Sequence, residues 1–77
     1  MKVGDFITFS GCYHVEVDSH RHRFEMNVKQ RKGVVVQRKI LEEGGAQLKV
    51  FSDNEFCILN VGEDDCFAEV VNAQRRE

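Results

Sequence analysis

The stretch "FITFSGCYHVEV", Phe6 to Val17, decides the fold class, because apolar residues recur along it at every second position. One set of alternate positions holds Ile7, Phe9, Gly11, Tyr13, Val15 and Val17. Successive side chains of a strand point to opposite faces, so a period of two indicates a long strand with one buried face. Gly11 has no side chain to pack and predicts a bulge or bend at that point.

Asp18-Ser19 is a turn signal, and alternation resumes after it, with Phe24, Met26 and Val28 in phase and the charged residues between them. This predicts a hairpin over about residues 10–32. A two-residue turn pairs Val17 with His20, Val15 with His22 and Tyr13 with Phe24. It places Tyr13, Val15, Phe24, Met26 and Val28 on one face, and His14 on the face opposite to His22. A slip of one residue reverses every side chain and sets Arg23 beside Val15, where burying an unpaired charge is costly.

The remaining chain carries further short strands separated by turn residues. They are "VVVQRKIL" after Gly33, then "QLKVF", "EFCILN" and "FAEVV", with one helical turn expected near Gly62–Asp65. Six short strands predict a small antiparallel barrel, whose closure removes exposed strand edges. The expected interior residues, about one per strand, are Ile7, Phe9, Val35, Val50, Ile58 or Leu59, and Val70. We expect one domain over residues 1–72, followed by a frayed polar tail over 73–77.

Four segments together resemble the small SH3-like β-barrel proteins of bacteriophage type: "KVGDFITF", "KGVVVQ", "VFSDNEFCILN" and "FAEVV". The resemblance implies an all-β fold, a small antiparallel SH3-like barrel with an extended β-hairpin inserted after the first strand. Most such proteins have no assigned activity, so the resemblance implies a fold and a phage origin. The chain has no tryptophan and no acidic-aromatic loop motif, so recognition of proline-rich peptides is not expected.

Composition limits the function classes. The formal net charge is −2, but residues 18–41 carry a balance of +5 and residues 42–77 a balance of −6. The longest apolar run, Val34–Val36, is far too short to span a membrane, and the N-terminus lacks the apolar segment of a signal peptide. Three cysteines without a CxxC spacing favour a reducing cytoplasm, the host cytoplasm if the protein is phage-encoded.

We expect no enzyme and no cofactor, because the sequence contains no activated nucleophile pattern, no GxGxxG and no Walker motif. The favoured function is a non-enzymatic protein-binding accessory module that docks through the hairpin and a barrel face. The expected hairpin contacts are Tyr13, Val15, His20, His22, Phe24 and Met26. The uneven charge and the projecting hairpin also predict a homo-oligomer, most simply a dimer.

Two alternatives remain open. The first is a nucleic-acid-binding barrel, with affinity that falls steeply as salt rises. Its contacts would be Arg21, Arg23, Lys29, Arg31, Lys32, Arg38 and Lys39. The second, weaker alternative is a metal or pH sensor built from Cys12, His14, His20 and His22, whose spacing suits a transition metal. The two-residue turn, however, points the first pair of ligands away from the second.

Overall fold

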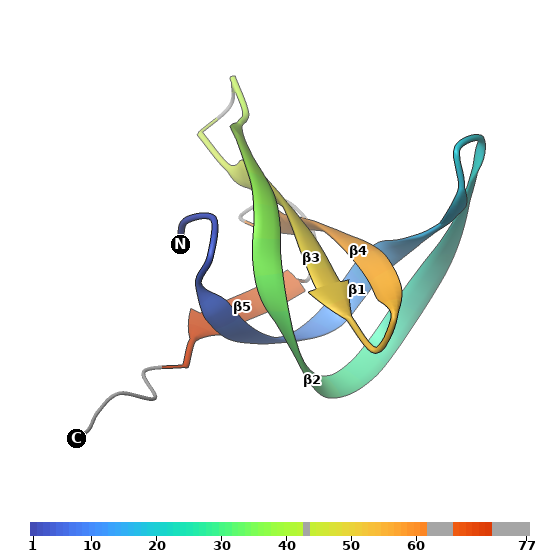
Figure 1. Cartoon of the computed structure of the whole chain (residues 1–77), viewed down its shortest axis with the longest axis horizontal. Helices are drawn as coiled ribbons and strands as arrows, with labels where there is room; N and C mark the ends of the chain where they lie inside the picture. The colour runs from blue at the N-terminus through green and yellow to red at the C-terminus, as the bar shows by residue number, and fades with distance from the viewer. Residues whose placement is uncertain (43, 62–65, 72–77) are drawn as a thin grey trace.

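The part of the chain that the structure describes forms five antiparallel strands, four of which close into a small barrel while the fifth pairs with the first (Figure 1). The computed structural model describes residues 1–42, 44–61 and 66–71, without the side chains at positions 27 and 28. The strands are β1 (Phe6–Asp18), β2 (Arg21–Ile40), β3 (Ala46–Ser52), β4 (Glu55–Val61) and β5 (Cys66–Val70). The predicted turn near Gly62–Asp65 and the predicted tail over 73–77 lie outside the described residues.

Strand β1 closes the barrel because both of its edges are paired. One edge pairs with β2 along its length, from Phe6↔Val34 to Asp18↔Arg21. The other edge pairs with β5 at its N-terminal half and with β4 at its C-terminal half. Strand β3 joins β2 to β4, which gives the order β2-β3-β4-β1-β5 with an additional β2–β1 pairing. The prediction of an all-β, small antiparallel SH3-like barrel with an extended hairpin is therefore confirmed.

The predicted second and third strands are one continuous strand of 20 residues, β2. The expected strand start at Gly33 was wrong, because Gly33 pairs with Ile7 inside the β1–β2 ladder. Irregularities in register relieve the strain of bending so long a strand around a small barrel. They occur around Gly11, which has a φ of 99°, and between Val35 and Gln37. The bulge predicted at Gly11 is confirmed.

Gly33 is needed for close packing of β2 against the end of β3. A Cβ at this position would lie 2.5 Å from Cγ1 of Val50 and 2.7 Å from the carbonyl oxygen of Phe51. Both distances are shorter than van der Waals contact, and the carbonyl belongs to the backbone and cannot rotate away.

Gly33→Ala should therefore destabilise the barrel by about 1–3 kcal/mol, the usual cost of overpacking. Urea unfolding followed by circular dichroism measures this change. Val34→Ala, at the adjacent outward-facing position, is the control and should cost less than Gly33→Ala. Equal stability of Gly33→Ala and the parent protein would contradict the packing argument.

The core is a single cluster inside the barrel, with members from all five strands. The buried apolar residues are Ile7, Phe9, Tyr13, Val15, Val35, Leu48, Val50, Cys57, Leu59 and Cys66. Ile7, Phe9, Val35, Val50 and Leu59 confirm the predicted interior. Val70 was predicted wrongly: it pairs with Ile7 but is the last residue of β5 and remains 45% exposed. Strand β5 contributes Cys66 to the core instead, and Ala68 packs against the core.

The predicted hairpin register was also wrong. The structure pairs Glu16 with His22, Val15 with Arg23, His14 with Phe24 and Tyr13 with Glu25, after an irregularity between Glu16 and Asp18. Phe24 therefore faces outward with His14 and is 49% exposed, instead of sharing a face with Tyr13. Two hydrogen bonds to the Asp18 carboxylate hold the turn: from the backbone N–H of His20, which contributes most to lowering its pKa, and from the Arg21 side chain.

Arg23 explains why this register is acceptable. Its guanidinium donates to the Glu25 carboxylate and, at 3.1 Å, to Oε2 of Glu55. Its side chain is 48% exposed, so the charge beside Val15 is neither buried nor unpaired. Long arginine side chains can place their stems over apolar surface while the charge reaches solvent or a partner.

Candidate binding groove

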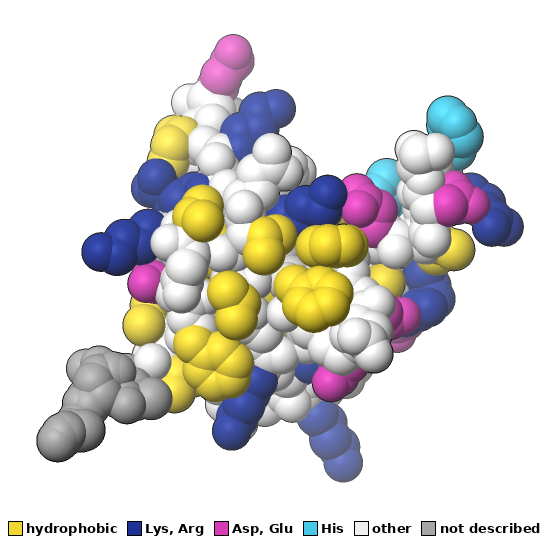
Figure 2. Space-filling view, viewed as in Figure 1, with side chains coloured by type: hydrophobic (Ala, Val, Ile, Leu, Met, Phe, Trp, Pro, Cys, Tyr) yellow, Lys and Arg dark blue, Asp and Glu magenta, His cyan; other side chains and the backbone are white. Residues whose placement is uncertain are grey.

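A groove crosses the outer face of the barrel between two projections, the tip of the β1–β2 hairpin and the β2–β3 connection (Figure 2). Its volume is about 490 Å³. An adjoining hollow of about 370 Å³ shares Gln37, Gln47, Lys49 and Ile58 with it and extends it toward Arg38 and Lys39. We call the two together the saddle groove. Its lining residues are His14, Glu16, His22, Gln37, Arg38, Lys39, Gln47, Lys49, Ile58 and Asn60.

Strand alternation places the floor of the saddle groove. Leu48 and Val50 of β3 are buried, so Gln47 and Lys49 point outward; Cys57 and Leu59 of β4 are buried in the same way. The outward residues of β3 and β4 then meet across the ladder, with Lys49 opposite Ile58 and Gln47 opposite Asn60. The Gln47 amide donates a 3.0 Å hydrogen bond to Oδ1 of Asn60, which fixes one end of the floor.

Positive charge predominates among the residues lining the saddle groove. Arg38, Lys39 and Lys49 contribute three cations, whereas Glu16 is the single carboxylate. Glu16 lies 3.2 Å from the Lys49 ammonium, which also lies 5.0 Å from the ring centre of Phe56. The groove is therefore basic within a chain whose formal net charge is −2.

An apolar row runs beside the saddle groove across four strands. It consists of Phe6, Val34, Phe51 and Phe56, which are successive cross-strand partners. Each of these side chains is about two-fifths exposed, and the rings of Phe51 and Phe56 are 5.1 Å apart. Figure 2 shows hydrophobic side chains gathered on this face. A contiguous exposed apolar row on a small protein is typical of a contact surface.

The predicted hairpin contacts divide into core and surface residues. The side chains of Tyr13 and Val15 are at most 2% exposed and belong to the core. The prediction that they contact a partner is therefore wrong. His20, His22, Phe24 and Met26 are exposed, as a contact surface requires. Of these four, only His22 lines the saddle groove.

The histidines do not lie as predicted. His14 and His22 share the outer face, with ring centres 6.4 Å apart, and His14 packs against Phe24 at 4.8 Å. The prediction that they face opposite sides is wrong, because the register is shifted by one residue. Among the residues that the structure describes, no group of three or more His, Cys, Asp or Glu side chains could hold a metal ion.

The predicted basic contacts do not form one surface. Arg21 pairs with Asp18, and Arg23 with Glu25 and Glu55. Arg31 has a side chain only 15% exposed and is held inside the structure. Lys29, Lys32, Arg38 and Lys39 are exposed, but only the last two line the saddle groove.

Arg31 ties the base of the hairpin to the β3–β4 turn. It donates hydrogen bonds to Oγ and the carbonyl of Ser52, to the hydroxyl of Tyr13 and to Oε1 of Glu55, all at 2.9–3.0 Å. The hydrogen bonds from Arg31 and then Arg23 hold the pKa of the Glu55 carboxyl below its ordinary value. Burial raises the pKa of the Tyr13 hydroxyl. This network therefore joins β1 and β2 to the end of the barrel where β3 and β4 meet.

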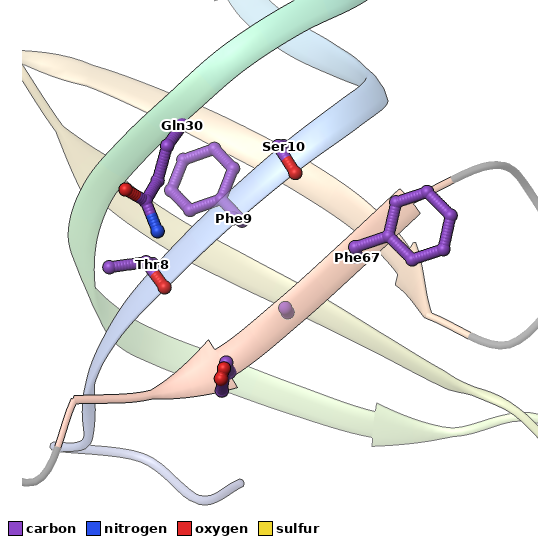
Figure 3. Close-up of a pocket in the computed structure, with 7 residues that line it drawn as sticks. Thr8, Phe9, Ser10, Gln30 and Phe67 are labelled. Carbon is purple, nitrogen blue, oxygen red and sulfur yellow. The ribbon is translucent and has the colours of Figure 1, made fainter.

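A second, smaller hollow of about 220 Å³ lies on β1 between β2 and β5 (Figure 3). Thr8 and Ser10 form its floor, Gln30 borders it from β2, and Phe67 borders it from β5. Glu69 is the one ionisable side chain among its lining residues.

The sequence-based reasoning missed the groove floor. Gln37, Gln47, Lys49, Ile58 and Asn60 were not predicted as contacts. The outward phase of "QLKVF" and "EFCILN" could have identified them as one surface once the barrel was assumed. This surface lies beside the hairpin because β1 pairs with β4, with His14 opposite Ile58. No local sequence pattern predicts that pairing.

Comparisons with protein-family models, with curated proteins and with solved structures found no match to this chain. Over the described residues, there is no helix with the length and apolar character needed to cross a membrane.

Proposed function

We propose that this protein is a non-enzymatic protein-binding accessory module that docks through the apolar row and the adjoining saddle groove. The observation that carries the proposal is the exposed row of Phe6, Val34, Phe51 and Phe56. Aromatic side chains are enriched at the centres of protein interfaces, where their burial supplies much of the binding energy. The hairpin contributes His22 as one wall of the groove.

A phage origin and a cytoplasmic location, the host cytoplasm if phage-encoded, belong to the same proposal. The resemblance of the sequence to small phage barrels supports the first. The small number of cysteines, three without a CxxC spacing, supports the second, because disulfide frameworks are rare in reducing compartments.

The ion pairs within the basic segment argue against the nucleic-acid alternative. Arg21, Arg23 and Arg31 are engaged with carboxylates of the same chain. Sequence-independent binding of nucleic acid depends on cations that can contact phosphates, and these three ion-paired arginines are less available for such contacts.

The test is quantitative capture of proteins from the native host, or from infected cells, on the immobilised chain. A Phe51→Ser and Phe56→Ser double variant should reduce capture of the true partner by roughly tenfold or more, since buried aromatic anchors dominate interfaces. The fold should survive, because both side chains lie on the outer face and neither belongs to the core cluster. Phe67→Ser, at a side chain 67% exposed on β5, is the matched control and should leave capture unchanged.

Equal capture by both variants and the parent protein would refute docking through the apolar row. Sedimentation equilibrium on the same three proteins identifies the kind of partner. A dimer of the parent protein that dissociates only in the double variant makes the partner a second copy of this chain, as the predicted homo-oligomer requires.

A further inference from the structure

We propose that the saddle groove binds an acidic, extended polypeptide segment, and that Glu16 competes with that segment for Lys49. The inference rests on the proposed function and specifies the chemistry of the partner. It follows from the charge of the groove, its span, and the ion pair at its centre.

The charge of the groove selects an anionic partner. Arg38 and Lys39 of β2 lie toward one end, and Lys49 lies in the floor between them and the hairpin wall. The opposite wall presents His14 and His22, whereas Glu16 is the single carboxylate among the lining residues. A hollow lined mainly by one sign of charge concentrates the opposite sign, even on a protein of opposite net charge.

The span of the groove selects an extended chain. From Gln37 in β2 to His22 in the hairpin, the groove crosses four inter-strand spacings, at most roughly 19 Å. An extended segment of about six residues covers that distance. Its side chains point alternately to two sides, so one set can face the cations of the groove while the other set faces the neighbouring apolar row.

Glu16 already occupies the place that a partner's carboxylate would take. Its Oε1 lies 3.2 Å from the Lys49 ammonium, which is positioned over the Phe56 ring at 5.0 Å. Both members of the pair are about 30% exposed, and pairs this accessible to water are weak. An incoming carboxylate can therefore displace Glu16 without the cost of breaking a buried ion pair.

The test is a titration of the ¹⁵N-labelled protein with a synthetic octapeptide in which valine and glutamate alternate, followed by amide chemical shifts. Shifts should centre on Lys49, Ile58 and Asn60. Lys49→Gln should weaken binding about twofold to fivefold, and Glu16→Gln should strengthen it by a similar factor. Lys32→Gln is the charge-matched control for Lys49→Gln, because Lys32 pairs with Thr8 and lies outside the groove. This control should leave the affinity for the peptide unchanged.

The gain of affinity in Glu16→Gln is the diagnostic result, because loss of a merely structural ion pair would not improve binding. Unchanged or weaker binding of that variant overturns the competition. Equal binding of an octapeptide alternating valine and lysine, or no binding of the acidic peptide, overturns the acidic partner. Tighter binding of oligodeoxythymidylate that is lost in Lys49→Gln makes the partner a nucleic acid and overturns the proposal.

Failure of this inference is separable from failure of the proposed function. If Phe51→Ser with Phe56→Ser abolishes partner capture while Lys49→Gln leaves it unchanged at low and high salt, the module docks through the apolar row alone. The acidic partner and the contribution of the saddle groove are then excluded, whereas the proposal of a protein-binding module that docks through the apolar row stands.

Discussion

Replacing Phe9 with alanine is expected to lower the free energy of unfolding by about 3–5 kcal/mol, as large truncations in a packed core do. Phe9 is 1% exposed, and its ring meets that of Tyr13 edge to face at 5.2 Å. The substitution removes this contact and leaves a cavity among residues that strand pairing holds in place. Domains of this size have little stability to spare, so the loss is a large fraction of the total.

Urea unfolding followed by tyrosine fluorescence measures the effect, with the midpoint expected to fall and the slope to stay constant. Phe67→Ala is the same chemical change at a side chain 67% exposed and should stay within about 0.5 kcal/mol of the parent protein. A Phe9→Ala variant as stable as Phe67→Ala would mean that the barrel is not packed around Phe9.

Replacing Arg31 with methionine is expected to cost roughly 2–4 kcal/mol, because the substitution leaves its partners behind. The Tyr13 hydroxyl and Oγ of Ser52 lose a charged donor, and Glu55 loses its closest cation. Thermal unfolding at neutral pH measures this loss. Arg38→Met, which removes an exposed guanidinium from the same strand, is the control and should change stability by less than about 0.5 kcal/mol.

The pH dependence of stability gives a second readout for Arg31. The depressed pKa of Glu55 means that its contribution is present above about pH 4.3, the ordinary glutamate value, and is lost as pH falls through the lower pKa of the folded state. The parent protein should therefore lose stability over this acidic range more steeply than Arg31→Met. Identical pH slopes for the two proteins would show that the Arg31–Glu55 pair does not contribute.

The barrel could be predicted from the sequence because its strands are amphipathic with a clean period of two. Alternation from Phe6 to Val17 and within "QLKVF" assigns inside and outside correctly for Ile7, Phe9 and Val50, whereas "EFCILN" left Ile58 and Leu59 as alternatives. Such a pattern is local, and it needs no knowledge of which strand pairs with which.

The hairpin register could not be predicted, because its determinants lie far away in the sequence. Pairing Arg23 beside Val15 looks unfavourable within the hairpin alone. Glu55 of β4 supplies the missing carboxylate for Arg23 and also binds Arg31. The same limitation applies to the candidate groove, whose central pair, Lys49 and Glu16, comes from β3 and β1 with β4 between them.

The pairing of both edges of β1 has a consequence for folding kinetics. Its pairing with β2 near the hairpin turn joins residues close in sequence, but its other edge pairs Ile7 with Val70, near the opposite end of the described chain. Contacts between distant residues require closure of a long loop before they contribute, so barrels of this type fold slowly. During synthesis the hairpin can form early, whereas the N-terminal half of the other β1 edge stays unpaired until β5 has left the ribosome. That interval exposes the nascent chain to strand-to-strand aggregation.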